Sequence, residues 1–509
     1  MSGAIDDRTS VAPASVGRSQ VLAVLASIML PVFLAVVDQT IVSTALPSMA
    51  ATLGGVERVS WVVVAYLIAT TIAAPIYGQM RDIYGGRRLM IIALVVFMSA
   101  SLVCAVSTSM EMLAVARVLQ GLGGGGLMTL SQARIGEAIP PRDRARYQGY
   151  IAAVIVTSST LGPIIGGVLT HTFGWRSIFL INLPLGLIAL AQVLRLPKAA
   201  FPAKSPAFDH AGLACFVIFI VSLLFTLELC RQPAALNAIA VIGLGMVAVT
   251  SAVLLMRIER RAAAPLFPLA LFARAEILRS DLLAACHGAA LVSLVTILPL
   301  YFHVFTASTA ADTGLVLLPL LVGVGTGSML TGRLVSSSGR TTIFPSYGLI
   351  VTTVLMVVLA LEIGSLRGLP LGALLFCLGL SMGTVMGVVQ ITVQCAAGPG
   401  MLGSAAASVQ LSRSLGAAVG TAFTGMILFI MLAMSDANAT QIFVVLVQKG
   451  AAAIPNFYRL PVHGEIVRAF QAAFLTIAVF TAMGCAIAWS IPARHLASER
   501  IEPPDIATS

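Results

Sequence analysis

Long apolar runs, separated by short polar segments, follow one another along the whole chain. Each run holds about 20 residues, enough for a helix that rises ~1.5 Å per residue to cross a hydrocarbon layer of ~30 Å. Helices are required because lipid offers backbone groups no hydrogen-bond partners, and the runs lack the ~10-residue alternation of barrel strands. The pattern predicts about fourteen spanning helices, at residues 21–46, 59–79, 89–107, 111–136, 147–170, 176–195, 211–230, 235–256, 281–304, 313–334, 342–363, 370–395, 404–433 and 468–491.

The first run begins near Val21 and continues toward Leu46. It is too long for a signal-peptide core of roughly 7 to 15 residues, so we predict that it is the first spanning helix. The segment 434–467 between the last two runs shows no clear fold of its own.

Glycines recur at a fixed spacing in the two halves of the chain. A shift of 254 positions superposes five pairs: Gly78 on Gly332, Gly85 on Gly339, Gly149 on Gly403, Gly162 on Gly416 and Gly166 on Gly420. The shift superposes the first six helices on the last six, so the sequence predicts an all-α polytopic membrane protein with two six-helix bundles and two inserted central helices. The predicted parts are a cytoplasmic tail at 1–20, bundles at 21–195 and 281–491, a linker with the inserted helices at 196–280, and a second cytoplasmic tail at 492–509.

Composition agrees with lipid as the main solvent. Apolar residues make up 58% of the chain and charged residues only 10%, against roughly 25% charge in soluble domains. With both termini in the cytoplasm, about twenty of the Lys and Arg residues lie on the inside, as the positive-inside rule requires. That distribution accounts for the net charge of +10 without a nucleic-acid partner. Neither the six histidines nor the seven cysteines show metal-ligand spacing, so no metal site is expected.

A charged turn rich in glycine follows the second predicted helix. It contains Gly78, Asp82, Gly85, Arg87 and Arg88. The glycines allow a tight turn and close helix approach, and Asp82 can meet one of the arginines or a neighbouring helix end. On physical chemistry alone, a turn that merely anchors the helix at the lipid headgroups explains these residues equally well.

Two opposite charges lie within apolar helices at similar predicted depth. Arg117 lies ~10 Å and Asp38 ~13 Å inside the outer ends of their helices at the helical rise. A charge in lipid needs a partner, and intramembrane charges are functional more often than structural. The two residues are therefore expected to pair.

The fifth helix carries Gly162, Pro163, Gly166 and Gly167. Glycines let helices approach closely, and a proline interrupts the backbone hydrogen bonds and bends the helix. On physical grounds, small-residue packing is the simpler explanation of this motif.

Together these motifs resemble those of the major facilitator superfamily, in particular its fourteen-helix drug:proton antiporters. The resemblance covers nearly the whole chain, although the specific motifs lie in the first half. It implies that the turn at Asp82 and Arg87 gates the inner side, and that the glycines around Pro163 mark an exporter. Ser336 replaces Asp82 in the second copy of the turn, and Ser43 replaces an asparagine usual in the first helix.

The resemblance implies a proton-coupled exporter of drugs or other small amphipathic compounds in a bacterial inner membrane, driven by the proton gradient without a cofactor. Asp38 is then the proton-coupling residue and Arg117 sets its affinity for protons. Six side chains are weaker candidates for an aromatic and amide substrate lining: Tyr66, Gln120, Tyr301, Phe302, Gln390 and Gln394. A periplasmic adaptor and an outer-membrane channel are partners that some relatives use.

Two other functions stay open at this point. One is a metabolite or nutrient transporter of the same fold, which the exporter-type glycines disfavour. The other is an intramembrane enzyme, which would require a convergent constellation of His, Asp, Ser or Cys that the sequence does not show. An ATP-driven pump is disfavoured because the chain has no Walker-type loop.

Overall fold

The structure is a computed structural model, and it describes residues 18–54, 59–196, 209–230, 238–262, 265–266, 269–306, 310–435, 437–449 and 461–492. Within these residues, fourteen helices are long and apolar enough to cross a membrane. The spans of the first half are α1 (Arg18–Leu53), α2 (Val59–Tyr84), α3 (Gly86–Ala105), α4 (Met110–Ala138), α5 (Pro141–Phe173), the broken pair α6 (Ser177–Leu180) and α7 (Asn182–Leu194), and α8 (His210–Cys230). Those of the second half are α9 (Ala238–Glu259), α11 (Ala275–Thr306), α12 (Ala310–Ser338), α13 (Ile343–Glu362), α14 (Gly368–Ala397), α15 (Leu402–Ser435) and α17 (Pro461–Ser490). The predicted class, two six-helix bundles and an inserted pair of helices, is confirmed.

Helices α1 to α7 pack on one another as one bundle. Glycine lets α4 lie directly on α2: a Cβ on Gly121 would stand 2.6 Å from the carbonyl oxygen of Tyr66, and one on Gly125 would stand 2.8 Å from the Cα of Thr70. Small residues are what allow helix backbones to approach in lipid, where no hydrophobic force drives helices together. The run of glycines in α4 therefore fixes the spacing of the first bundle.

Helices α11 to α17 form the second bundle, in which α15 packs on α11 and α14 packs on α12. One end of this bundle holds an aromatic cluster, where the rings of Tyr301, Phe305 and Phe443 lie within 6.0 Å of the Phe470 ring, centroid to centroid. A short helix, α16 (Ala437–Lys449), supplies Phe443. The expectation that 434–467 has no fold is therefore wrong for α16, because its apolar face packs on the bundle; residues 450–460 lie outside the described part of the chain.

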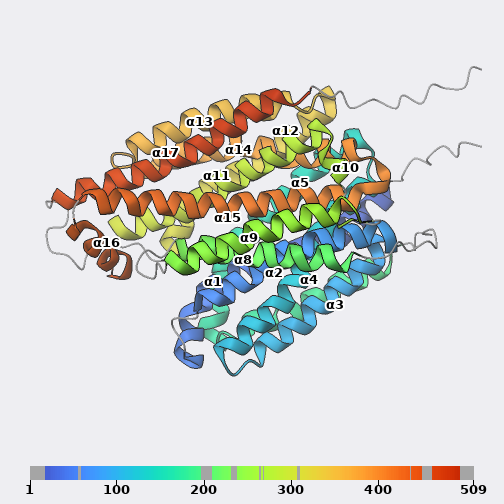
Figure 1. The fold of residues 1–509 in the computed structure, drawn as a ribbon, viewed down its shortest axis with the longest axis horizontal. Helices are drawn as coiled ribbons and strands as arrows, with labels where there is room; N and C mark the ends of the chain where they lie inside the picture. The colour runs from blue at the N-terminus through green and yellow to red at the C-terminus, as the bar shows by residue number, and fades with distance from the viewer. Residues whose placement is uncertain are drawn as a thin grey trace, which may run out of the picture.

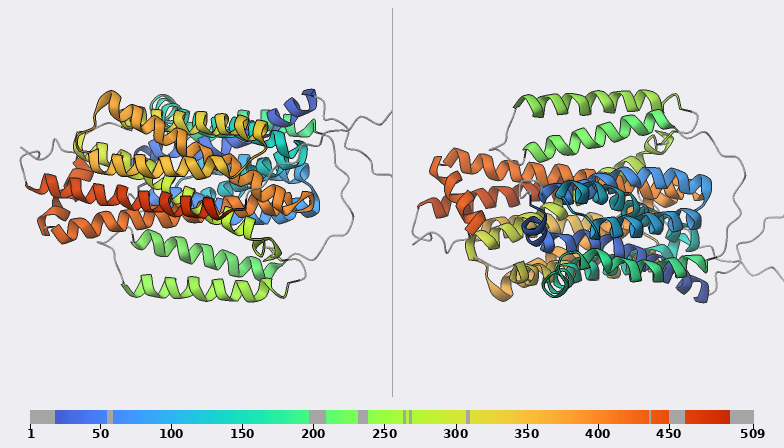
Figure 2. Two further views of the ribbon diagram at one scale, coloured as in Figure 1. Left: turned by 90° about the horizontal axis from the view of Figure 1, so that it is seen from above. Right: turned by 90° about the horizontal axis from the view of Figure 1, so that it is seen from below.

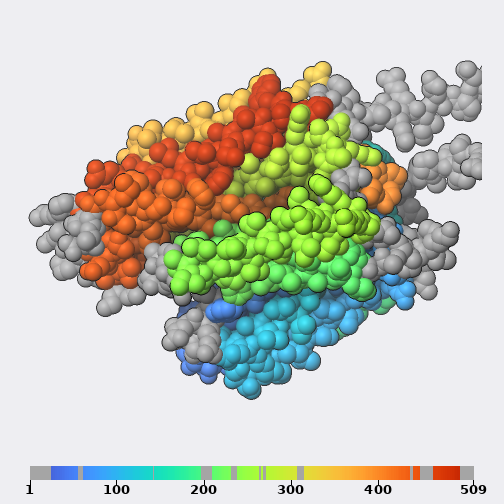
Figure 3. All heavy atoms as spheres, viewed as in Figure 1, coloured from blue at the N-terminus to red at the C-terminus, as the bar shows by residue number. Residues whose placement is uncertain are grey.

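The inserted helices α8 and α9 lie side by side against the outside of the bundles, as both views of Figure 2 show. Phe216 and Ile220 of α8 are buried in a cluster with Ile72 of α2 and Leu411 of α15, so α8 contacts both bundles. In Figure 3 the pair covers the junction between the two halves on this face. Helix α9 exposes apolar side chains such as Ile239 and Met246, as a lipid-facing helix should.

The two bundles converge at the end of the molecule that carries the turn between α2 and α3, which we call the Gly85 end (Figure 1). Close approaches of backbone join them there. A Cβ on Gly78 would stand 2.8 Å from the carbonyl oxygen of Gly403, and one on Gly149 would stand 2.7 Å from the Cα of Met329. The bundles separate toward the opposite end (Figure 1). Helix α1 ends there at Leu53, so we call it the Leu53 end.

Candidate functional site

Asp38 and Arg117 form an ion pair inside the first bundle. The Nη1 atom of Arg117 lies 2.5 Å from Oδ2 of Asp38, and the two side chains are 1% and 0% exposed. Helix α1 turns Asp38 toward α4, whereas its neighbours Gln39 and Ser43 are exposed on the other side of α1. The pairing expected from their depth is thus present, and it is sealed from solvent in this conformation.

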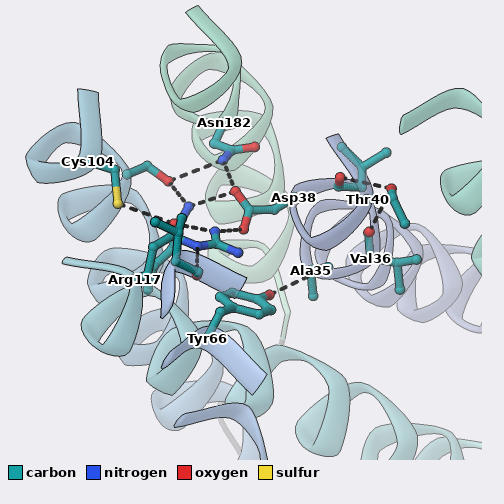
Figure 4. A network of polar contacts seen from close by, with 12 residues as sticks. Ala35, Val36, Asp38, Thr40, Tyr66, Cys104, Arg117 and Asn182 are labelled. Carbon is teal, nitrogen blue, oxygen red and sulfur yellow. Dashed lines mark hydrogen bonds and ion pairs between the residues drawn. The ribbon is translucent and has the colours of Figure 1, made fainter. Parts of the chain in front are cut away.

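Two amides complete the coordination of the Asp38 carboxylate (Figure 4). Gln120 Nε2 and Asn182 Nδ2 each donate to Oδ1 at 2.8 Å. Both amides also donate to the hydroxyl of Ser101, at 2.7 and 3.2 Å. The carboxylate therefore accepts three hydrogen bonds from two other helices, α4 and α7, and Ser101 of α3 ties these donors together.

Arg117 is held by further contacts with α2 and α4. Its Nε donates to the carbonyl of Val62 at 3.3 Å, and its Nη1 donates to Gln120 Oε1 at 2.7 Å. Its guanidinium carbon stands 4.1 Å above the ring of Tyr66, a cation–π contact. The Tyr66 hydroxyl in turn donates to the carbonyl of Ala35 at 3.1 Å.

The electrostatics of this cluster are those of a buried ion pair. Removing both charges from water costs several kcal/mol per ion, which the interior repays only when geometry and hydrogen bonds are good, as they are here. Removing one partner leaves an uncompensated charge, a far less favourable state. The pair is therefore favourable in this conformation only while both partners are present.

Asp82 of the charged turn joins the two bundles at the Gly85 end. Its carboxylate accepts from the backbone N–H groups of Gly403 and Ser404 and from the Ser404 hydroxyl, each at 2.9 Å. These residues open α15, so the acid caps the positive end of a helix in the other bundle. Of the partners expected for Asp82, the helix end is therefore the one observed.

The arginines of the turn have separate partners. Arg81 pairs with Asp82 at 2.8 Å and with Glu137 of α4 at 3.3 Å. Arg87 donates to the carbonyls of Val193 and Leu194 at the end of α7, whereas the side chain of Arg88 is exposed. Pairing of Asp82 with Arg87 or Arg88 is not seen, because Arg87 points back into its own bundle.

The glycine motif of α5 packs on α1. A Cβ on Gly162 would overlap the Thr40 side chain, and one on Gly166 would stand 2.7 Å from the carbonyl oxygen of Ile41. A Cβ on Gly167, in contrast, would meet no other atom within 4 Å. Pro163 lies inside α5, between the two contact glycines. The motif thus sets the closeness of α5 to the helix that carries Asp38.

The six residues suggested as a substrate lining are not gathered in one place. Tyr66 and Gln120 belong to the charged cluster. Tyr301 donates to the carbonyl of Ile363 at 3.0 Å, and Phe302 packs against the same apolar core at the Leu53 end. Gln390 is 2% exposed on α14.

Gln394 donates across the bundle interface to the carbonyl of Gln132 at 2.9 Å. Like Tyr66, Gln120 and Gln390, it is buried in this conformation. A role in substrate contact stays a prediction for all six residues.

Two members of the charged cluster, Asn182 and Ser101, are not among the site residues predicted from the sequence. The available signal was a strongly polar side chain within a long apolar run, since buried polar groups are almost always hydrogen-bonded. Within the described residues, no group of three or more His, Cys, Asp or Glu side chains could hold a metal ion.

Residues 28–421 match the Major Facilitator Superfamily. Multidrug resistance protein 3 of Bacillus subtilis is 31% identical over 309 residues, which cover 61% of this chain and 60% of that protein. Multidrug transporter protein MdtP of the same organism is 28% identical over 404 residues, which cover 79% of this chain and 74% of that protein. The match thus spans less than two thirds of the first of these relatives.

Among solved structures, the proton:xylose symporter XylE superposes with a TM-score of 0.62 at 14% identity, over 94% of this chain and 98% of that one. The human organic anion transporter MFSD10 superposes with a TM-score of 0.62 at 16% identity, over 92% and 99%. At such identities the likeness shows the fold.

Proposed function

This chain belongs to the Major Facilitator Superfamily, and from that premise we propose that it is a proton-coupled exporter of drugs or other small amphipathic compounds. The observation that carries the proposal is the fully buried Asp38, held by Arg117 and two amides in the middle of a spanning helix. The amides satisfy the carboxylate in this closed conformation, and the position of the acid within a span is what favours a functional role. An intramembrane acid with such a tuned shell is the kind of group that transporters use to carry protons.

In this mechanism Asp38 takes up and releases its proton in different conformations. In the conformation described here the carboxylate is paired with Arg117 and sealed. When the helices of the first bundle shift, the pair loosens, water reaches the carboxyl, and a proton replaces the arginine as its partner. Substrate and proton then favour different conformations of the protein. Because of this, substrate moves across the membrane in exchange for a proton.

The gate in this proposal is the Gly85 end. The contacts of Asp82 with Gly403 and Ser404 hold the bundles together there, while they diverge toward the Leu53 end. We assign the Gly85 end to the cytoplasm because its loops carry the excess of Lys and Arg. The conformation is then closed to the cytoplasm. In this proposal the protein spans a bacterial inner membrane and both chain termini lie on its cytoplasmic side.

The substrate class in the proposal is suggested by two relatives named as multidrug proteins. Gln39 and Ser43 are exposed polar residues of α1 that are separate from the Asp38 cluster, and we include them as candidate contacts of the substrate. A periplasmic adaptor and an outer-membrane channel stay predictions that rest on the resemblance alone.

Transport in inside-out membrane vesicles tests the proposal. With an acidic lumen, vesicles that contain the protein should accumulate a lipophilic substrate and lose luminal protons when that substrate is added, both of which a protonophore abolishes. Vesicles without the protein provide the background. Loss of substrate from the lumen under the same gradient would instead indicate a symporter or importer, and transport without proton movement would refute coupling.

A further inference from the structure

Two basic residues, Arg413 and His287, lie at the same level of adjacent helices in the second bundle. Arg413 lies eleven residues into α15 and His287 twelve residues into α11, so both are about 16 to 18 Å from the Gly85 end of their helices at the helical rise. Gly288 lets the helices touch at this level, because a Cβ there would stand 3.1 Å from Cγ of Arg413.

Neither side chain has its polar atoms satisfied within the described part of the chain. His287 is 3% exposed, and both of its ring nitrogens are buried without a hydrogen-bond partner. The Nε atom of Arg413 is buried and unpartnered in the same way. Buried polar atoms in native proteins are rarely left so, and an arginine within a span calls for a partner.

The acids of the neighbouring helices do not supply that partner. On α11, Asp281 lies six residues nearer the Gly85 end, about 9 Å away along the helix, and Oδ1 of this acid accepts from Ser408 at 3.4 Å. Glu276 lies in the first turn of α11, and Glu465 lies at the Leu53 end of α17. Helices α14 and α15 carry no acid. Among the described residues, no carboxylate lies within ion-pair distance of Arg413.

The position of Arg413 on α15 lies between the face that packs on α11 and the face that packs on α2. Gly416 and Gly420 mark the face of α15 that lies on α11, and Gly403 marks the face that lies on α2. At about 100° per residue, Arg413 falls between these two faces. Leu411 and Leu415, which pack on α8, lie on the far side of the helix. The residue as a whole is half-buried and not sealed, unlike Arg117.

We propose that Arg413 and His287 form the binding subsite for the anionic group of the substrate, and that carboxylate-bearing amphiphiles are a substrate class of this transporter. The guanidinium offers a rigid fork of donors that matches a carboxylate, and imidazole keeps at least one N–H donor in either protonation state. A bound carboxylate would thereby provide the counter-charge that the fold omits. This inference rests on the proposed export function for its physiological meaning, but binding itself needs no proton gradient.

Equilibrium binding to the purified full-length protein in nanodiscs tests the inference. The probes are dansylated undecanoic acid, its primary amide and the analogue with a trimethylammonium head, each corrected for partition into empty nanodiscs. The wild-type protein should bind the carboxylate most tightly. Arg413→Gln should weaken carboxylate binding by roughly tenfold or more, the scale of a lost charge-assisted hydrogen bond, while amide binding changes by less than about twofold.

Two further variants separate charge from folding. Arg413→Lys keeps the charge and should retain the preference for the carboxylate, and Arg340→Gln removes an exposed arginine elsewhere in this half and should change nothing. The inference is overturned if the wild type shows no preference for the carboxylate, or if Arg413→Gln weakens all three probes equally. Failure of coupled transport in vesicles together with intact carboxylate selectivity would refute the exporter proposal and leave this subsite standing.

Discussion

In the first bundle α4 carries Arg117 into an ion pair with Asp38, whereas α14 of the second bundle carries Leu371 at the position one repeat later. Leu371 is 5% exposed and belongs to an apolar core that includes Leu375 and Phe470. The glycines that bring α4 onto α2 and α14 onto α12 are present in both halves. One helix arrangement thus supports a rigid charged cluster in one copy and an apolar core in the other.

The same contrast appears at the Gly85 end. Asp82 caps α15 of the second bundle with three hydrogen bonds. In the second copy of the turn, the contact with the first bundle is instead made by Gly332, which lies against the backbone of Ala145. The difference teaches that close packing is shared by the two copies at these positions, whereas the ion pair at Arg117 and the acid cap at Asp82 belong to the first. Mutations in the first bundle should therefore affect coupling and gating most strongly.

The largest effect is expected at Asp38. Asp38→Asn keeps the size of the side chain and removes the exchangeable proton, so proton-coupled efflux should fall at least about a hundredfold while the protein stays in the membrane. Efflux from energised cells, with membrane abundance measured by immunoblot, checks this. Glu362→Gln, which alters an exposed acid of the second bundle, is the matched control and should transport normally. Full efflux by Asp38→Asn would refute the assignment.

The second-largest effect is expected on the free energy of unfolding when one partner of the Asp38–Arg117 pair is removed. Arg117→Met leaves the Asp38 carboxylate buried without its counter-charge, which should cost about 3–5 kcal/mol. The double variant Asp38→Asn/Arg117→Met removes both charges and should recover much of this loss. Thermal unfolding of the purified variants measures both effects. A double variant that is less stable than Arg117→Met would show that Asp38 and Arg117 do not compensate each other's charge.

The packing of α5 on α1 gives a smaller and sharper test. Gly166→Ala places a methyl group against the backbone of Ile41, which cannot move aside easily, and should cost about 1–3 kcal/mol and slow transport. Gly167→Ala, one residue along, meets open space and should be neutral. Equal behaviour of the two variants in thermal unfolding and efflux would contradict the packing.

The smallest effect is expected at the gate. Asp82→Asn keeps the shape of the cap and removes its charge, which should weaken closure at the Gly85 end by about 1 kcal/mol. Spin labels at Tyr84 and Gly400, whose positions flank the junction, should then report a larger population of long distances. An unchanged distance distribution would mean that the Asp82 contacts do not hold the bundles together.

Much of the fold follows from the sequence because membrane spans obey local rules. Fourteen apolar runs predicted fourteen spans, although most helices extend a few residues beyond the apolar part, as with α5, which begins at Pro141. Helix α16 was missed because its residues are too few and too polar to span lipid. It forms on the surface of the second bundle by packing Phe443.

The site was partly predictable for the same reason. Asp38 and Arg117 stand out because charge is rare in lipid, and their similar depth suggested the pair. The roles of Asn182 and Ser101 depend on which helices meet, which no local pattern encodes. Asp82 illustrates the same limit: its partners, Gly403 and Ser404, lie in the other half of the chain.

Proton release on substrate binding tests the central claim most directly. Purified wild-type protein in weakly buffered detergent solution should release about one proton per bound substrate as the Asp38 carboxyl loses its proton, read with a pH-sensitive dye. Asp38→Asn should bind the same substrate and release none. Equal release by the two proteins would contradict the account, because the exchanged proton would then belong to another group.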